Sequence, residues 1–539
     1  MSARGIEPDV VEIEVFRHRV AAIAEEMGAV LARSGFSANI KERRDFSCAV
    51  FDSDGQLVAQ AAHIPVHLGS MQLAVESVLA RCTLVEGDVV GVNDPFSGGT
   101  HLPDLTLVAP VCLAQRTRPF GYVAARAHHA DVGGAFPGSM GLAEEIYQEG
   151  IRLPPVYIVR RGRVCADVIE IFTGNTRVPE ERKGDLLAQL AALRVGKKRL
   201  RELAFTAGRA RLRAAMAALQ DYSERRLRGV LRSLPKGVFR ARDYLDDDGM
   251  GATRLPLCVA IAVEASTMTF DFSGSASQTR GGVNANLAVT WAAVLYCLQL
   301  LARGEIPANA GLMRPVRLVA PEGTIVNARF PAAVAGGNVE TSQRIVDVVL
   351  RALAQAAPDR VPAASCGSMN NVAIGGTGAA PAATFAYYET IGGGAGGGPN
   401  GPGASGLHTH MTNTWNTPVE ALEAQYPLRV TEYSIRRGSG GSGFHRGGDG
   451  IVREIELLSR ARVSLLTERR TYAPWGLWGG GPGHPGRNWL VRSNKAKPQD
   501  RGKQPLPAKV TIAVGPGDRV RLETPGGGGW GKIQGARGR

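Results

Sequence analysis

The chain has 539 residues, which is too long for one ordinary hydrophobic core and predicts two to four domains. Its net charge is +14, but the basic residues are not gathered into one arm. No zinc-finger spacing or aromatic RNA-binding signature occurs, so we expect no nucleic-acid partner. No apolar run reaches the length of about 18 residues that a membrane helix requires, and we expect no membrane span.

Cysteine usage points to a reducing compartment. Seven cysteines are scattered singly along the chain, without a CxxC pair. Single cysteines within apolar runs are typical of buried thiols that do not form disulfides. The N-terminus also lacks the apolar segment of a secretory signal. These features predict a cytoplasmic protein.

The N-terminal part is predicted to mix helices and strands. A helix is expected over Val10–Arg33, because Asp9 and Glu12 form a capping-box pattern and apolar residues follow at helical spacing. Two apolar runs flank Asp52–Gly55 and predict a hairpin. The other elements expected before residue 178 are a helix over Ser70–Arg81 and strands over Asp88–Asn93, Leu105–Val111 and Gly121–Ala127.

A helical segment and then a change of composition follow. Leucines at helical spacing run from Pro179 to Leu234, and the glycines at 184, 196 and 208 are expected to divide this stretch into several helices. Short strands begin after Pro235, so we place a domain boundary there, between residues 1–235 and 236–539. The next expected elements are strands over Arg240–Tyr244, Cys258–Glu264, Met268–Phe272 and Val316–Leu318, and helices over Leu287–Arg303 and Thr341–Ala357.

The C-terminal part is predicted to be rich in strands and glycine. The chain has 68 glycines, about twice the usual share, and their clusters after residue 392 mark tight turns or close backbone approaches. The predicted fold is a multi-domain α+β protein with a mixed α/β N-terminal part, a helical middle segment and a β-rich, glycine-rich C-terminal part. The last elements expected are strands over Gly450–Leu457, Val463–Thr467, Val510–Ala513 and Arg519–Leu522, and a polar loop over Asn494–Pro507.

A turn rich in glycine and proline carries the first candidate site. A predicted strand ends near Asn93, and His101 and Asp104 follow in H-x-x-D spacing. On a loop or a helical turn, residues three apart can converge on one point. Imidazole nitrogen and carboxylate oxygen together suit Zn²⁺, Mn²⁺ or Fe²⁺. The alternative is that both are turn residues whose polar groups are satisfied within the protein.

The second candidate site follows the predicted strand over Gly121–Ala127 and contains His128, His129 and Asp131. Side chains alternate along a strand, so the two histidines should point in opposite directions. At most one would then join His101 and Asp104, and the other could bind a ligand or act as an acid or base. Three protein ligands would leave positions open for water or substrate, as in catalytic metal sites.

Two more histidine groups leave alternatives open. His63 and His67 either line the same pocket or are an ordinary pair of one buried and one surface histidine. His408, His410, Thr412 and Thr414 should share one face of an extended segment. That face either binds a ligand or partner, or is solvated.

Nucleotide-binding motifs are absent from the sequence. There is no G-x-x-x-x-G-K-[ST] loop, no Rossmann G-x-G-x-x-G after a strand, and no G-x-S-x-G elbow. Nucleotide binding by this chain alone is therefore not supported.

Several long motifs resemble the hydantoinase B/5-oxoprolinase family over nearly the whole chain. They include NDPFSGGTHLPDLTLVAPV, RAHHADVGG, GGNVETSQRIVDVVLRAL, HTHMTNTWNTPVEALEAQYPL and ETPGGGGWG. The resemblance implies a B subunit that pairs with a hydantoinase A-type, ATP-binding subunit and opens hydantoin, lactam or 5-oxoproline rings with ATP hydrolysis. The alternatives are a subunit of an ATP-dependent acetone or acetophenone carboxylase and a non-catalytic scaffold subunit.

The resemblance also implies roles for the candidate residues. His101, Asp104 and His128 would be the metal ligands, with His128 preferred to His129 because it is the first histidine of its motif. The divalent metal (Zn, Mn or Fe) would polarise a carbonyl or activate water. His129 and Asp131 would then be the candidate catalytic residues for acid–base chemistry.

Overall fold

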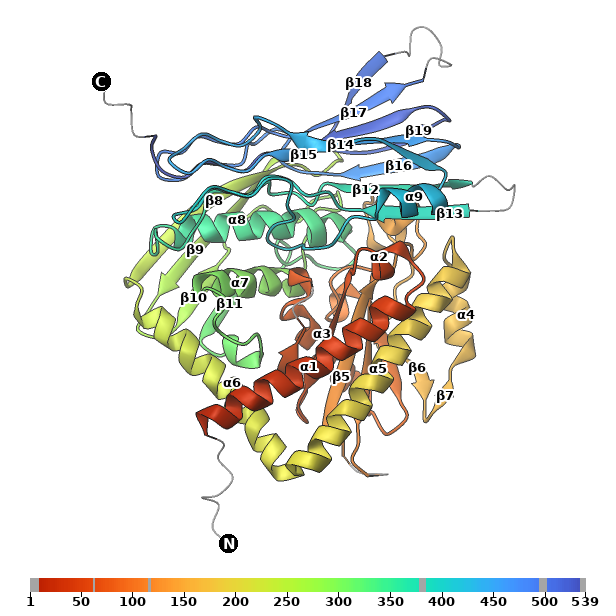
Figure 1. The fold of residues 1–539 in the computed structure, drawn as a ribbon, viewed down its shortest axis with the longest axis vertical. Helices are drawn as coiled ribbons and strands as arrows, with labels where there is room; N and C mark the ends of the chain where they lie inside the picture. The colour runs from red at the N-terminus through yellow and green to blue at the C-terminus, as the bar shows by residue number, and fades with distance from the viewer. Residues whose placement is uncertain (1–8, 62–63, 115–117, 378–383, 494–501, 534–539) are drawn as a thin grey trace.

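The computed structural model describes residues 9–61, 64–114, 118–377, 384–493 and 502–533 (Figure 1). It confirms the α+β class, since helices pack on sheets whose strand pairs within these residues are antiparallel in every case but one. The helices are α1 (Val10–Ser34), α2 (Ala38–Lys41), α3 (Ser70–Arg81), α4 (Ala166–Gly174), α5 (Pro179–Ala207), α6 (Arg209–Arg232), α7 (Leu287–Leu301), α8 (Ser342–Leu353) and α9 (Val419–Gln425).

The N-terminal part is built on a seven-stranded sheet in the order β2-β1-β5-β4-β3-β6-β7. Helices α1 and α5 lie together across one face of this sheet, and α3 packs on the other (Figure 1). The sheet is therefore buried on both faces, which is why its central strands are almost wholly apolar. The strands are β1 (Phe46–Phe51), β2 (Leu57–Gln60), β3 (Val89–Val92), β4 (Asp104–Val111), β5 (Gly121–His128), β6 (Val156–Arg160) and β7 (Arg163–Val164).

Helix α5 is longer than its glycines predict. Two expected breaks are wrong, because the helix continues through Gly184 and Gly196. A Cβ atom at Gly184 would lie 2.4 Å from the Phe36 ring, and one at Gly196 would lie 2.3 Å from the Met27 sulfur. These glycines allow close packing and do not end the helix. Only Gly208, with φ of +85°, separates α5 from α6.

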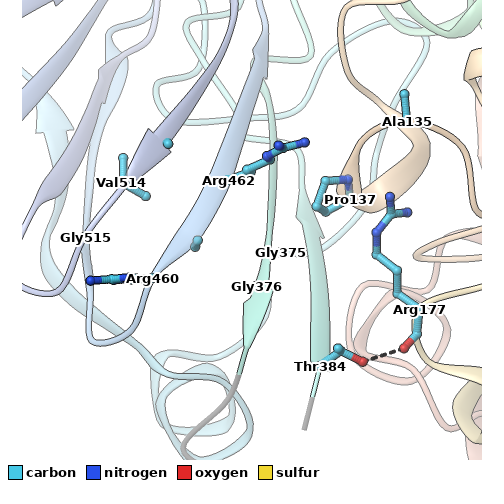
Figure 2. Close-up of a pocket in the computed structure, with 12 residues that line it drawn as sticks. Ala135, Pro137, Arg177, Gly375, Gly376, Thr384, Arg460, Arg462, Val514 and Gly515 are labelled. Atoms are coloured by element: carbon cyan, nitrogen blue, oxygen red, sulfur yellow. Dashed lines mark hydrogen bonds between the residues drawn. The ribbon is translucent and has the colours of Figure 1, made fainter. Parts of the chain in front are cut away.

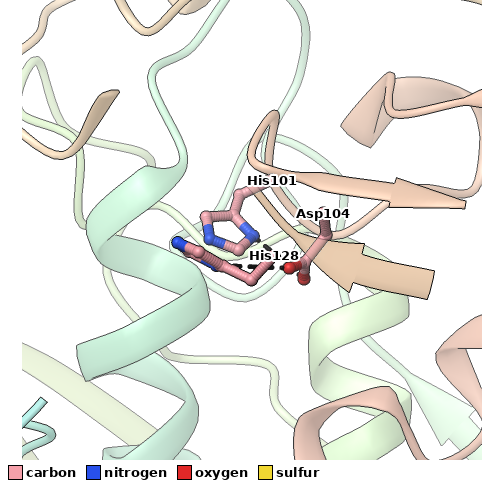
Figure 3. A group of neighbouring side chains, drawn as sticks. All are labelled: His101, Asp104 and His128. Carbon is pink, nitrogen blue, oxygen red and sulfur yellow. Dashed lines mark ion pairs between the residues drawn. The ribbon is translucent and has the colours of Figure 1, made fainter. Parts of the chain in front are cut away.

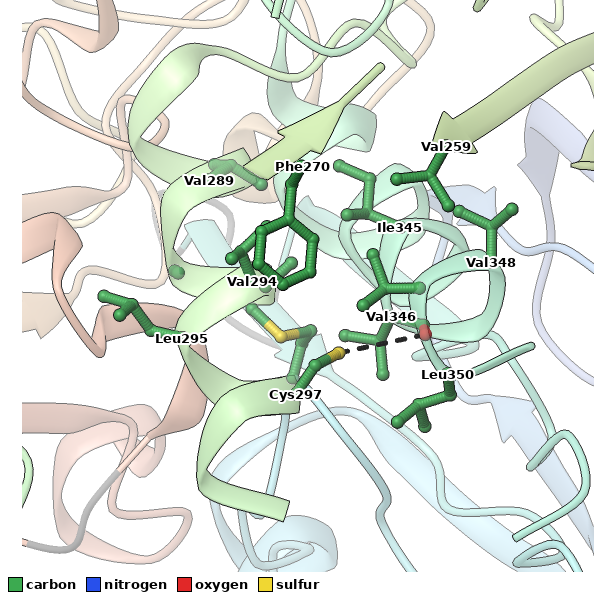
Figure 4. Packing of buried hydrophobic residues seen from close by; sticks show 14 of the residues in the cluster. Val259, Phe270, Val289, Val294, Leu295, Cys297, Ile345, Val346, Val348 and Leu350 are labelled. Atoms are coloured by element: carbon green, nitrogen blue, oxygen red, sulfur yellow. Dashed lines mark hydrogen bonds between the residues drawn. The ribbon is translucent and has the colours of Figure 1, made fainter. Parts of the chain in front are cut away.

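A second sheet, in the order β11-β10-β9-β8, packs against α7 and α8. Figure 4 shows the core between them, where Phe270 of the sheet meets Val294 and Ile345 of the helices. The same core includes Leu227 and Leu231 of α6, so apolar packing crosses the boundary placed at residue 235, and that division stays a prediction. The strands are β8 (Gly237–Asp247), β9 (Thr253–Val263), β10 (Met268–Asp271) and β11 (Val316–Val319).

Two further sheets form the C-terminal part and share one apolar core. The predicted loop over Asn494–Pro507 is wrong in part, because β18 pairs with β17 there, and residues 494–501 lie outside the described residues. The strands are β12 (Asn371–Thr377), β13 (Thr384–Glu389), β16 (Ala461–Leu466) and β19 (Lys509–Val514) in one sheet, and β14 (Leu428–Arg436), β15 (Gly450–Leu457), β17 (Arg487–Arg492), β18 (Gly502–Leu506) and β20 (Arg519–Glu523) in the other.

The glycine clusters of this part occur where backbones meet. A Cβ atom at Gly447 would lie 2.0 Å from the carbonyl oxygen of Gly527, and one at Gly527 would lie 2.0 Å from that of Ala395. Only glycine permits such an approach between loops. Within the described residues, no helix combines the length and the apolar character needed to cross a bilayer.

Candidate metal centre

His101, Asp104 and His128 come together where two strands of the first sheet begin and end. Asp104 opens β4 and lies directly opposite His128, the last residue of β5. His101 precedes the strand by one turn, and its carbonyl oxygen accepts a hydrogen bond from the backbone N–H of Asp104 at 3.1 Å. The H-x-x-D spacing therefore folds as a turn into a strand, and the antiparallel register supplies the third side chain.

The loop that carries His101 is fixed from two sides. The Asn93 side-chain amide donates to the carbonyl oxygens of Leu102 and Ile151. Asn286, at the N-cap of α7, donates to three carbonyl oxygens of the loop, those of residues 95, 99 and 100, at 2.9–3.0 Å. Because α7 follows residue 235, the second half of the chain holds the candidate site in shape.

The three side chains aim at a common point (Figure 3). One ligand atom from each can be chosen so that all lie within 4.8 Å of one another. His101 Nδ1 lies 3.1 Å from Asp104 Oδ2, and His128 Nδ1 lies 3.4 Å from Asp104 Oδ1. All three are buried, and His101 and Asp104 are only 1 % exposed.

One side-chain atom from each of the three residues lacks a hydrogen-bond partner within the described residues. His101 Nδ1, Asp104 Oδ1 and His128 Nε2 are buried and none makes a hydrogen bond of acceptable geometry. Buried polar atoms are almost always paired, and unpaired ones cost free energy. A divalent cation held by two imidazoles and a carboxylate would satisfy such a set, so these residues fit a metal.

The protonation states suit a metal as well. Burial raises the pKa of Asp104, but His101 and His67 outweigh it and hold the pKa well below its ordinary value. Burial lowers the pKa of His128, with Asp45 acting in the opposite direction. An ionised carboxylate and a neutral imidazole are the forms that bind metals.

His67 joins this cluster, as one of its two interpretations predicted. Its Nε2 atom lies 3.3 Å from Asp104 Oδ2, and its Nδ1 atom lies 2.8 Å from Ser47 Oγ. Thr100 Oγ1 donates to Asp104 Oδ2 at 2.6 Å and helps to orient the carboxylate. His63 lies outside the described residues. Sequence spacing did not single out Thr100 or Ser47, since neither is part of a ligand pattern.

His129 points to the opposite side of the sheet, as strand alternation predicted. Its Nε2 atom lies 3.0 Å from Gln189 Oε1 of α5, and its ring meets Phe172 edge-on. Burial, aided by the Arg182 charge, lowers the pKa of His129 to about 4. Gln189 also donates to the carbonyl oxygens of Leu105 and Ala125, so this histidine belongs to the contact between α5 and the sheet.

Asp131 stabilises the loop after β5. Its carboxylate accepts from the backbone N–H groups of Gly133 and Gly138 and from Arg177, at 2.9–3.0 Å. The catalytic roles expected for His129 and Asp131 stay predictions, and their contacts favour a positioning role for both.

The cavity in front of the cluster is small and is lined from both halves of the chain. Its volume is about 20 Å³. Asn338, on a π-helical turn over Gly337–Thr341, places its Nδ2 atom 3.5 Å from His101 Nε2. Tyr388 of β13 stacks on His128, with ring centroids 4.7 Å apart. The other lining residues are Asp45, Ile64, Val66, His67, Val339, Met369, Thr390, Met411, Thr412 and Thr414.

The segment that follows His410 lines the same cavity as the metal cluster. The alternation expected for its four polar residues breaks at His410, which has φ of +60°. Thr412 and Thr414 are buried and line the cavity, so for them a solvated face is wrong. His410 lies beside Tyr296 and Asp347, away from the cavity lining.

A larger groove lies elsewhere, over the sheet of β12, β16 and β19 (Figure 2). Its volume is about 610 Å³, and three of its lining residues are Arg177, Arg460 and Arg462. Thr384 donates to the Arg177 carbonyl oxygen at 2.7 Å, and the Arg177 guanidinium is engaged by Asp131. None of the candidate metal ligands lines this groove, so the larger of the two cavities is not the one that adjoins the candidate metal centre.

The sequence profile described as Hydantoinase B/oxoprolinase matches residues 9–533. The chain belongs to this family. An uncharacterized protein of Methanocaldococcus jannaschii is 42 % identical over 97 % of this chain and 91 % of its own length. The 5-oxoprolinase 1 of Arabidopsis thaliana is 40 % identical over 97 % of this chain, but the chain spans only 42 % of that protein.

Two solved structures share the fold. The ATP-dependent caprolactamase of Pseudomonas jessenii has a TM-score of 0.90 and 28 % identity, over 97 % of this chain and 91 % of that one. Acetone carboxylase has a TM-score of 0.88 and 17 % identity, over 96 % of this chain and 75 % of that one. At that identity the second likeness shows the fold alone.

Proposed function

We propose that this chain is the B-type subunit of an ATP-dependent hydrolase of cyclic amides, with a divalent metal held by His101, Asp104 and His128. The observation that carries the proposal is the convergence of these three buried side chains on one point with unpaired ligand atoms. Ring opening is favoured because the likeness to a caprolactamase extends over 97 % of the chain, and a lactam is a cyclic amide.

ATP is assigned to a partner subunit. The chain matches less than half the length of the Arabidopsis 5-oxoprolinase, so that protein contains a further part that a separate A-type chain would supply here. The sequence also lacks a phosphate-binding loop. The substrate is expected to be a lactam, a hydantoin or 5-oxoproline.

The protein's own residues prepare the site in three ways. Thr100 and His67 orient the Asp104 carboxylate. Tyr388 and Asn338 fix the planes of the two imidazoles. The apolar residues Val66, Val339 and Met369 exclude bulk water from the cavity. When bound, a divalent metal would polarise the amide carbonyl or activate a water molecule.

The decisive experiment is co-expression with an A-type subunit, followed by measurement of bound metal and of ATP hydrolysis. The complex should hydrolyse ATP in the presence of 5-oxoproline, a hydantoin or a lactam, with ring-opened product in equal amount. His101→Ala should abolish both metal binding and turnover. His18→Ala, on the exposed surface of α1, is the matched control and should change neither.

Two results would contradict the proposal. Turnover of a ketone that requires bicarbonate would make the complex a carboxylase. Full activity of metal-free protein, or of His101→Ala, would leave this chain as a scaffold for the partner's site.

A further inference from the structure

A chain of three buried polar side chains ends at Tyr388, whose ring lines the cavity beside the candidate metal ligands. Its first member is Glu340, on the π-helical turn over Gly337–Thr341. Glu340 Oε1 accepts from Asn371 Nδ2 at 2.6 Å and from the backbone N–H of Met369 at 3.1 Å. Tyr388 Oη donates to Asn371 Oδ1 at 2.6 Å. All three members are at most 1 % exposed, so bulk water does not compete for these hydrogen bonds.

The direction of each hydrogen bond in this chain is fixed. Asn371 Nδ2 has two hydrogens, and it donates them to Glu340 Oε1 and to the Leu466 carbonyl oxygen. This turns Oδ1 toward Tyr388, and because an amide oxygen can only accept, the tyrosine hydroxyl must donate to it. A side-chain amide does not ionise, so the chain cannot pass a proton from Glu340 to Tyr388. Its effect is to hold the Tyr388 ring by the hydroxyl end, while the backbone of β13 holds the other.

The Tyr388 ring in turn contacts one candidate metal ligand. It stacks on the His128 imidazole, with ring centroids 4.7 Å apart and an angle of 15° between the ring planes. A metal-binding imidazole usually owes its orientation to a hydrogen bond with a group outside the ligand set. For His128 no such hydrogen bond is found among the described residues, since Nε2 has no partner and Nδ1 faces Asp104, itself a candidate ligand. The stack with Tyr388 is therefore the ring contact from outside the ligand set that fixes the plane of this imidazole.

Glu340 serves the chain as a neutral acceptor. Burial raises its pKa to about 8, and the charge of Glu468 acts in the same direction. The carboxyl group is therefore mostly protonated at pH 7. Its Oε1 atom accepts two N–H groups, and the amide oxygen of a glutamine can accept the same two. Glutamine at this position thus preserves the chain, whereas an apolar side chain of similar length breaks it.

We propose that Glu340 and Asn371 are positioning residues of the metal centre. Acting through Tyr388, they hold the His128 imidazole in the plane in which it binds a divalent metal. The inference rests on the proposed function only through its metal centre, and it involves no step of the ring-opening reaction. The GGNVET segment and β12 thereby help to set the metal affinity of a site whose ligands lie on and next to β4 and β5.

The first test removes one hydroxyl and keeps the stacked ring. Tyr388→Phe, in the full chain purified with its partner subunit, should bind Co²⁺ about 10-fold more weakly than the wild type, because loss of a contact that orients a ligand has an effect of this size. Its visible Co²⁺ absorption should also change, since that spectrum depends on ligand geometry. Tyr387→Phe is the matched control, because Tyr387 is equally buried but packs in the core of the C-terminal sheets. It should stay within about 3-fold of the wild type, with an unchanged spectrum.

A second pair of variants tests Glu340 itself. Glu340→Met removes the acceptor and should weaken Co²⁺ binding by about 10-fold, whereas Glu340→Gln keeps it and should bind within about 3-fold of the wild type. Combining Glu340→Met with Tyr388→Phe should weaken binding no more than either change alone, because both break the same chain. Effects that multiply to about 100-fold would show two independent disturbances and would contradict the chain. If Glu340→Met does not fold, the comparison of Tyr388→Phe with Tyr387→Phe decides alone.

The outcomes separate this inference from the proposed function. Co²⁺ binding by Tyr388→Phe within about 3-fold of Tyr387→Phe, with the same spectrum, would leave the metal centre in place and overturn the positioning role. A wild type that binds no Co²⁺ would overturn both. A complex that opens no ring, but whose Co²⁺ affinity falls in Tyr388→Phe and is kept in Glu340→Gln, would refute the hydrolase and support the positioning role.

Discussion

Two buried clusters of charged groups lie in the described part of this protein, and they differ in which groups surround the carboxylates. Around Asp104, imidazole and carboxylate atoms converge and several remain without partners. Around Arg344, on α8, opposite charges alternate. Arg344 contacts Glu468 at 3.2 Å and Asp243 at 3.4 Å, and Lys509 contacts Glu468 at 2.6 Å.

We interpret the Asp104 cluster as a candidate binding site and the Arg344 cluster as a structural connection. Burial lowers the pKa of Arg344, but Asp243 and Glu468 outweigh it and keep the guanidinium charged. The network ties β8 and α8 to residues that follow β16. It needs no outside ion, because cations and anions of the chain compensate one another. Both clusters contain buried atoms without a hydrogen-bond partner within the described residues, among them Arg344 Nε and Asp347 Oδ1 in the second, but around Asp104 one atom from each of three possible metal ligands converges within 4.8 Å. That convergence is the basis for proposing a metal site there.

The largest effect is expected from a substitution at Asp104, and it should appear in the activity of the complex. Asp104→Asn keeps the shape of the side chain but removes the charge that a divalent cation requires, so the complex should lose its metal and at least about 100-fold in activity. Metal analysis and turnover of the same sample test this. Asp54→Asn, at an exposed turn, is the control. A metal content equal to that of the wild type would remove Asp104 from the ligand set.

Removing the Arg344 charge from the second cluster should lower the stability of the fold. Arg344→Met leaves Glu468 and Asp243 without their shared cation and should cost about 3–5 kcal/mol of unfolding free energy. Chemical denaturation of the purified complex measures it. Arg351→Met, on the exposed side of the same helix, should cost less than about 1 kcal/mol. Equal losses for both variants would show that the network does not stabilise the fold.

Another buried acid, Glu149, has no cationic partner among the described residues and shows how an uncompensated carboxyl group affects stability. It accepts from the backbone N–H groups of Val334 and Ala335, and no cationic side chain pairs with it within the described residues. Burial raises its pKa from 4.5 to about 8. Its contribution to stability is thus complete below the unfolded pKa and is lost as pH rises toward 8, because only the unfolded chain releases the proton in that interval.

Glu149→Gln should therefore be more stable than the wild type near pH 8, on the order of 3 kcal/mol, and about equal to it near pH 4.5. Thermal unfolding of both proteins across this range gives the measurement. A difference that does not grow with pH would mean that Glu149 is ionised in the folded protein.

The smallest effect is expected at the neighbouring histidine. His129→Leu removes the contact with Gln189 but no candidate ligand, so metal content should stay unchanged and activity should fall by less than about 10-fold. The folded state should lose roughly 1–2 kcal/mol. His128→Leu, the same substitution at the adjacent histidine, should lose the metal. Loss of more than about 100-fold in activity with metal retained would give His129 the acid–base role predicted from the sequence.

Much of the fold follows from local patterns. The capping pair at Asp9 and Glu12 and the apolar spacing behind it predicted α1, and both capping bonds are present. Strands β12, β13, β14 and β17 were not predicted. Two glycines weaken the strand pattern of β12 (NVAIGGT), whereas β13 (TFAYYE) and β14 (LRVTEYSIR) contain the aromatic and β-branched residues that favour a strand. The glycines of α5 misled the prediction, since their role is to admit Phe36 and Met27.

The sequence by itself determined which residue types form the site, through the H-x-x-D spacing and the pair of adjacent histidines. Only the tertiary structure decided which histidine faces Asp104, because that depends on which face of β5 is covered by α5. It also decided that His67, Asn338, Tyr388 and three threonines complete the cavity. The physical reason is that these residues are brought together by the packing of separate sheets, and contacts between distant segments leave no local pattern in the chain.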